Sequence, residues 1–256
     1  MSYLTVTEMP GNKATKENID MLYTRYKWAS QFIQGKDVLE VACGAGQGLG
    51  FLAKKAKRVV GGDVDSEIVG RAIDYYQKRV EILQFDAHQI PFKDNSFDVI
   101  ILFEAIYYIK EPDKFLKECR RVLRKNGLVL LCTANKDWSG FNPSPFTFKY
   151  FSVPELTDLF KKYNFKVEIF GAFEVSENSF KSKIISQIRK IAVKFHLIPK
   201  TMKGKEKFKR LFYGKLLETP SEIKEGMTQY YQPIQISNET SNNQFKVLYA
   251  TAFKNN

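Results

Sequence analysis

The residues best suited to chemistry in this sequence are glycines and acids that directly follow short apolar runs. Gly44 and Gly46 come after the run at residues 37–42, and glycines there let the backbone approach a ligand closely. Asp63 ends the next run, where a carboxylate can accept hydrogen bonds from the two hydroxyls of a ribose. Asp86 ends the third run and can accept from the exocyclic amine of an adenine. Together, these three features predict a site for a ligand that contains adenosine.

Strands that alternate with helices must position these residues. We expect strands over residues 37–42, 58–63, 80–85, 97–103, 128–133, 165–170 and 245–253, and helices over residues 18–33, 47–56, 66–79, 112–124 and 154–163. Asn18 and Ser66 are the expected helix caps. Strands separated by helices form parallel sheets, and apolar strands without alternation are buried on both faces. The sequence therefore predicts an α/β fold whose site lies at the carboxyl ends of the strands.

The charge of the chain is concentrated in one segment. The 256 residues carry a formal net charge of +12, with 40 Lys or Arg against 28 Asp or Glu. Residues 176–215 account for +10 of it, which leaves a nearly neutral body and disfavours a nucleic-acid partner. No run approaches the roughly 20 apolar residues of a membrane span. The start of the chain has no secretory pattern and its three cysteines have no metal or redox spacing, so a cytoplasmic protein is expected.

The glycine spacing distinguishes between two cofactors that contain adenosine. In the dinucleotide fingerprint a third glycine stands three positions after the second, where this sequence has Leu49. The closer spacing here, together with Asp86 and Ala87, favours S-adenosyl-L-methionine. The segment VLEVACGAGQG resembles the first motif of class I S-adenosylmethionine-dependent methyltransferases. VVGGDVDSEIVGRA resembles their ribose segment, and FDAHQIPFKDNSFDVIILFEAIYYI resembles their adenine segment and fourth strand.

The resemblance covers about residues 20–175 and is closest to the branch that methylates sugars and other small metabolites. It implies a Rossmann-like, seven-stranded, mostly parallel sheet, in which residues 245–253 form a terminal antiparallel strand. Residues 1–175 and 244–256 would make up the methyltransferase domain, and residues 176–243 a basic helical insertion before the last strand. The sequence departs from the family at Ala42, where a glycine is frequent, without losing a side-chain contact.

The resemblance also implies which residues hold the cofactor. They are Tyr23, Arg25, Glu40, Ala42, Gly44, Gly46, Asp63, Val64, Asp86, Ala87, Phe103 and Glu104. Asp63 is expected at the ribose, Asp86 at the adenine, and Glu40 at the glycine loop or the methionine amine. Tyr23 and Arg25 lie on a helix expected to cover the cofactor. Arg25 either pairs with the methionine carboxylate or is a solvated surface residue.

Methyl transfer to a hydroxyl benefits from a general base, whereas an unprotonated amine hardly needs one. Tyr108 takes the place where many relatives carry a histidine after the fourth strand, and Asp137 follows the fifth strand. His88 follows the adenine motif, near the rim of the expected site. The alternative roles are a wall of the acceptor site for Tyr108 and a place at the rim for His88. No set of residues has the spacing of a zinc site.

We expect a small-molecule acceptor, such as a sugar or phosphate-linked metabolite, that is methylated on oxygen or nitrogen. The alternatives are a membrane-associated lipid or quinone-like acceptor, and a cofactor-binding protein without catalysis. Apolar residues recur at helical spacing in the basic segment, with lysines off that stripe. This pattern suits a packed cap, a lid over the acceptor site, or a polyanion or protein partner. It also suits peripheral contact with the inner membrane surface through residues 180–215.

Overall fold

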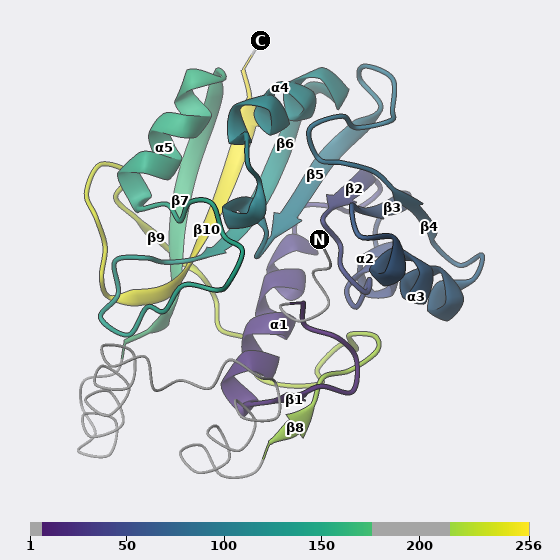
Figure 1. Cartoon of the computed structure of the whole chain (residues 1–256). Coiled ribbons are helices and arrows are strands. Elements are labelled where there is room, and N and C mark those ends of the chain that lie inside the picture. Colours follow the sequence, from purple (N-terminus) through teal and green to yellow (C-terminus); the bar gives the residue numbers. More distant parts are fainter. Residues whose placement is uncertain (1–6, 176–215, 256) are drawn as a thin grey trace.

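One twisted sheet positions the ends of the apolar runs. The computed structural model describes residues 7–175 and 216–255 (Figure 1). The strands of the sheet are β2 (Asp37–Val41), β3 (Arg58–Asp63), β4 (Glu81–Gln84), β5 (Phe97–Phe103), β6 (Leu123–Ala134), β7 (Phe165–Glu174), β9 (Ile234–Ile236) and β10 (Phe245–Lys254). Their order is β4-β3-β2-β5-β6-β10-β7-β9. Strands β4, β3, β2, β5 and β6 are parallel, so their carboxyl ends meet at one edge.

Strand β10 lies between β6 and β7 and is antiparallel to both. Val247 is paired with Ala134 on one side and with Ala172 on the other. The predicted Rossmann-like, mostly parallel sheet with an antiparallel strand near the end of the chain is therefore confirmed. The structure adds β9 as an eighth strand, which pairs with β7 at the sheet edge. Its three residues, IQI, are too few to produce a recognisable strand pattern.

Helices cover both faces of the sheet (Figure 1). They are α1 (Lys16–Ala29), α2 (Leu49–Ala53), α3 (Ser66–Tyr76), α4 (Pro112–Val122) and α5 (Val153–Lys162), and residues 106–108 form a short 3-10 turn. Alternate residues of β5 point to opposite faces, as the pleat requires. Ile100 packs in a core with residues of α4 and α5, whereas Ile101 packs in a second core with residues of α1, α2 and α3. The central strands are consequently buried on both faces.

Two helix starts differ from the sequence prediction. Helix α1 begins after Thr15, whose hydroxyl accepts from the backbone N–H of Asn18, so Thr15 is the cap and Asn18 lies in the first turn. Helix α3 is capped by Asp65, which accepts from the N–H groups of Glu67 and Ile68, and Ser66 is its first residue. In both cases neighbouring residues are of capping type, and the structure uses the earlier one.

The chain after residue 215 returns across the amino-terminal part of the protein. Strand β8 (Leu217–Glu218) pairs with β1 (Lys13–Ala14), and the side chain of Ile223 is fully buried. The N–H of Ile223 donates to the carbonyl of Gln47 at 2.9 Å. Of the expected insertion, residues 216–243 thus contribute strands β8 and β9, while the basic helix at residues 180–215 lies outside the described residues. Within the described ranges, no helix has the length and apolarity needed to cross a membrane.

Candidate functional site

The glycine loop after β2 and the end of β3 are joined by hydrogen bonds. Gly44 and Gly46 have φ values of +57° and +76°, which favour glycine. The N–H of Gly44 donates to Oδ2 of Asp63 at 3.0 Å, and the N–H of Asp65 donates to Oδ1 at 3.0 Å. Burial raises the pKa of Asp63, whereas these backbone donors favour its charged form. The carboxylate is fixed in place, and each oxygen keeps a lone pair for a ligand hydroxyl.

Glu40 is a buried carboxylate beside this loop. The hydroxyl of Tyr26 donates to its Oε1 at 2.6 Å. Within the described part of the chain, its buried Oε2 has no hydrogen-bond partner. Burial raises the pKa of Glu40 to about 7. Because a buried acceptor without a partner is costly, this oxygen is suited to receive a hydrogen bond from a bound amine.

Arg25 lies on α1, next to Tyr26. Its side chain is paired with the carboxylate of Glu8, and the residue is only 7% exposed, so it is not a solvated surface arginine. Its Nε is buried and has no hydrogen-bond partner among the described residues. The ring of Tyr26 lies 5.8 Å from the guanidinium carbon, and the hydroxyl of that ring is bonded to Glu40. An arginine and a carboxylate thus flank one aromatic ring.

The segment that carries Glu8 lies over the glycine loop. A methyl group added at Gly44 would stand 3.3 Å from Cγ2 of Thr7. Met9 forms a small apolar cluster with Ala45 of the loop and Ile68 of α3. This segment, residues 7–9, precedes β1 and so is anchored by the pairing of β1 with β8. Sequence reasoning did not find Glu8, because nothing in its local pattern indicates a contact with α1.

The other expected cofactor contacts are distributed along the strand ends. Phe103 ends β5 and packs edge-on against Tyr26, with ring centroids 5.4 Å apart. Val64 is half exposed beside Asp63. Ala42 has a φ of +54° at the start of the loop, a conformation that the frequent glycine would adopt more readily. Tyr23 is not brought to Arg25, because its hydroxyl donates to Glu225 and accepts from the N–H of Gly226, both at 3.0 Å.

Asp86 and His88 form a compact turn after β4. Oδ1 of Asp86 accepts from the N–H of His88 at 2.8 Å and lies 2.5 Å from Nδ1 of its ring. Nε2 of the same ring accepts from the N–H of Glu111 at 3.2 Å. Ala87 packs against the core that contains α4. Both ring nitrogens of His88 are therefore engaged, one with Asp86 and one with Glu111.

Glu104 follows β5 in a left-handed conformation, with a φ of +50°. It accepts from the hydroxyl of Tyr107 at 2.9 Å and lies 3.5 Å from Sγ of Cys132. Burial raises the pKa of Glu104, although the positive charge of Arg25 acts in the opposite direction. Left-handed backbone is uncommon outside glycine and often marks functional positions, so the conformation of Glu104 agrees with a place in the site.

Beyond Glu104 lies an aromatic cluster, made of Tyr107, Tyr108, Phe141 and Tyr150. Tyr107 stacks on Tyr150 with centroids 4.4 Å apart, and Phe141 meets Tyr150 edge-on at 4.7 Å. The hydroxyl of Tyr108 is 2.7 Å from Oγ of Ser144. Sequence reasoning found Tyr108 but missed Phe141 and Tyr150, which belong to the long loop after β6.

Asp137 starts that loop. Its N–H donates to Oδ1 of Asn135 at 3.0 Å. Among the described residues, its Oδ2 is buried and has no hydrogen-bond partner. Asp137 is therefore the one of the three candidate bases with a carboxylate oxygen left for an acceptor. No group of three metal-ligating side chains occurs in the described part of the chain.

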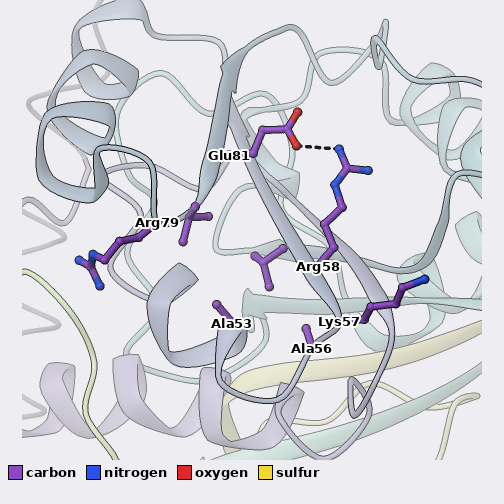
Figure 2. Close-up of a pocket in the computed structure, with 8 residues that line it drawn as sticks. Ala53, Ala56, Lys57, Arg58, Arg79 and Glu81 are labelled. Carbon is purple, nitrogen blue, oxygen red and sulfur yellow. Dashed lines mark hydrogen bonds and ion pairs between the residues drawn. The ribbon is translucent and has the colours of Figure 1, made fainter.

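A separate pocket of about 290 Å³ lies at the amino ends of β3 and β4 (Figure 2). Arg58 is paired with Glu81 at 2.7 Å, as Figure 2 shows, and Arg79 with Glu222 at 3.1 Å. This pocket is at the opposite end of the strands from the glycine loop, and both of its arginines have partners. It is not part of the candidate site.

Comparison with known proteins supports the expected resemblance. A family model described as a methyltransferase domain matches residues 39–131, which run from β2 to β6. A probable S-adenosylmethionine-dependent methyltransferase from Mycolicibacterium smegmatis is 36% identical over 140 residues, covering 52% of this chain and 53% of that protein. Over these residues the chain is therefore similar to S-adenosylmethionine-dependent methyltransferases. The family prediction is thereby confirmed, and the cofactor of the family is S-adenosyl-L-methionine.

A second curated relative and a solved structure are also similar to this chain. A fatty-acid O-methyltransferase from Mycolicibacterium smegmatis is 35% identical over 109 residues, covering 40% of this chain and 38% of that protein. The YcgJ protein from Bacillus subtilis has a solved structure with a TM-score of 0.59 at 17% identity, covering 91% of this chain and 98% of that one, which shows the shared fold. The chain spans about half the length, or less, of the curated relatives it matches.

Proposed function

We propose that this protein transfers a methyl group from S-adenosyl-L-methionine to an oxygen or nitrogen of a small-molecule acceptor. The observation that carries this proposal is that Arg25 and Glu40 both contact Tyr26, one at its ring and the other at its hydroxyl. Both side chains are buried, and each has an atom without a partner among the described residues. One cation and one carboxylate in such positions match the carboxylate and the ammonium group of the methionine end of the cofactor.

The remaining strand ends suit the adenosine part. Asp63 would accept from the ribose hydroxyls, beside Val64, because its carboxylate is already oriented by Gly44 and Asp65. Asp86 would accept from the adenine amine, with Ala87 next to the ring. When bound, the cofactor supplies a methyl group activated by its sulfonium. Phe103 and Glu104 stand at the carboxyl end of β5, where they would flank that methyl group.

The chain's own contribution to the reaction is alignment and, for a hydroxyl acceptor, removal of a proton. Holding the acceptor in line with the methyl group can supply several kcal/mol. Asp137 would accept the proton through its unpartnered Oδ2, and the oxygen–carbon bond would form as the carbon–sulfur bond breaks. Tyr108 would orient the acceptor through its hydroxyl, which Ser144 holds. His88, engaged with Asp86 and Glu111, is the third candidate.

The aromatic cluster supports one acceptor class. Stacked and edge-on rings favour an acceptor with an apolar body. This supports the lipid or quinone-like acceptor over the sugar or phosphate-linked metabolite. The fatty-acid O-methyltransferase among the relatives is consistent with that choice. Transfer of labelled methyl groups into a lipid extract and into a water-soluble extract separates the two classes, because the label appears in only one of them.

Calorimetry with S-adenosylhomocysteine, the demethylated cofactor, tests the site. Replacing Asp63 with Ala removes an acceptor of two ligand hydroxyls, so affinity should fall by about 100-fold or more. Asp74→Ala on the exposed side of α3 is the matched control and should leave affinity unchanged. Equal affinities for the two variants would contradict the site assignment. Cofactor binding without label transfer to any extract would favour the cofactor-binding protein without catalysis.

A further inference from the structure

The loop between β6 and α5 exposes two phenylalanines. Phe146 is 47% exposed and Phe148 is 57% exposed. The stretch that contains them, residues 139–148, reads SGFNPSPFTF and has no charged side chain. Large apolar side chains that are exposed next to each other on an uncharged loop commonly mark a contact surface.

Hydrogen bonds hold these two rings outward. The N–H of Phe148 donates to the carbonyl of Tyr107 at 2.8 Å, and the hydroxyl of Thr147 donates to the carbonyl of Ser144 at 3.0 Å. Phe146 adopts a φ of +67°, which is costly for a bulky side chain. The side chain of Phe146 is exposed, so packing does not offset this cost. The conformation therefore indicates a role for the ring other than stabilising the fold.

The exposed rings lie beside the aromatic cluster of the proposed acceptor site. Tyr150 joins the two, since its ring stacks on Tyr107 and its hydroxyl accepts from the N–H of Ser144 at 3.0 Å. In Figure 1 the loop lies below α5, at the end of the sheet where β7 also ends.

An exposed lysine flanks the loop tip. Lys136 and Lys149 both pair with Glu155, and Asp137 in the loop supplies a second carboxylate. The side chain of Lys149 is 56% exposed, directly after the apolar stretch. Exposed apolar rings next to an exposed lysine suit a surface of anionic lipid.

We propose that the loop tip, defined by Phe146 and Phe148, inserts into the headgroup region of an anionic lipid bilayer. The two rings enter the boundary between headgroups and acyl chains, while Lys149 meets the lipid phosphates. This docking would bring the acceptor site to the membrane surface. It goes beyond methyl transfer and does not depend on it, because binding to vesicles needs neither cofactor nor turnover.

Sedimentation of the full chain with large vesicles tests the proposal. Vesicles of equal parts phosphatidylglycerol and phosphatidylcholine should bind the protein, and the Phe146→Ser, Phe148→Ser double variant should bind at least about tenfold more weakly. Ile73→Ser on α3, where the side chain is 42% exposed, is the matched control and should bind like the wild type. Wild-type protein that stays in solution would overturn the proposal. So would a double variant that binds as well as the wild type.

Tryptophan fluorescence gives a second measurement that needs no variant at the tip. The chain has two tryptophans, of which Trp28 is 2% exposed in the core and Trp138 lies in the loop itself. Brominated acyl chains should quench the emission of the wild type, and Trp138→Phe should remove the quenched part. Binding without quenching would overturn the proposal, because another surface of the protein would then make the contact. Unchanged S-adenosylhomocysteine affinity in the double variant shows that the variant is folded.

Discussion

The guanidinium of Arg25 in α1 is paired with the carboxylate of Glu8, which comes from the segment that lies over the glycine loop. Glu8 thus pairs with the same guanidinium that is expected to bind the carboxylate of the cofactor. Burial opposes the charge of Arg25, and Glu8 is the main group that favours it, so that the pKa of Arg25 stays well above its ordinary value. A bound cofactor could replace Glu8 without leaving Arg25 unpaired.

Glu8→Gln should therefore raise the affinity for S-adenosylhomocysteine, because it removes a competing charge from Arg25. Arg25→Gln should lower the affinity about tenfold or more, since a buried charge-assisted bond is lost. Calorimetry at one pH compares the two variants. Glu67→Gln, which removes an exposed carboxylate paired with Arg71, serves as the control. A Glu8 variant with weaker binding would show that Glu8 supports the bound state.

The buried carboxyl of Glu40 should make stability depend on pH. Burial raises its pKa to about 7 in the folded protein, against about 4.3 in an unfolded chain. The folded state then holds the proton more tightly than the unfolded chain does. The contribution of the Glu40 carboxyl to the free energy of unfolding is therefore complete below about pH 4 and is lost as the pH rises through 7. Urea denaturation of wild type and Glu40→Gln at pH 5 and pH 8 measures this. The free energy of unfolding should fall less between these pH values in the variant.

Gly48 gives Tyr26 the space that it needs to reach Glu40. A methyl group at Gly48 would stand 1.9 Å from a ring carbon of Tyr26, so Gly48→Ala should destabilise the fold by about 2 kcal/mol or more and displace the ring. Gly70→Ala is the matched control, because it lies in α3 with no atom within 4 Å of the added methyl group. That change should stabilise the protein by up to about 1 kcal/mol. Thermal unfolding of both variants checks the contrast.

The three candidate bases should differ in their effect on turnover. Asp137→Asn should lower kcat by a factor of about 100 or more if the acceptor is a hydroxyl. Tyr108→Phe should have a smaller effect, mainly on KM, and His88→Gln the smallest, because both nitrogens of His88 are engaged at the rim. Initial rates with labelled cofactor measure all three. Full turnover in the Asp137 and Tyr108 variants would leave both without a catalytic role.

The strand ends were predictable because the central strands are short, mostly apolar runs. Asp63 is an example, since it ends RVVGGD and the structure fixes it at that strand end. Contacts between distant segments were not predictable in this way. Glu8 and Arg25 are 17 positions apart, and only the packing of the segment before β1 brings them together. Likewise, the pairing of Tyr26 with Glu40 depends on the ring position that Gly48 permits.

The place of β10 in the sheet has a consequence for the synthesis of the chain. Strands β6 and β7 are made first, yet neither pairs with the other, because β10 lies between them. Both therefore keep an unpaired edge on the growing chain until β10 emerges about 70 residues after β7. Unpaired strand edges attract other chains. The nascent protein is consequently most exposed to aggregation while the basic segment, which carries most of its net charge, is being synthesised, and that charge repels like chains.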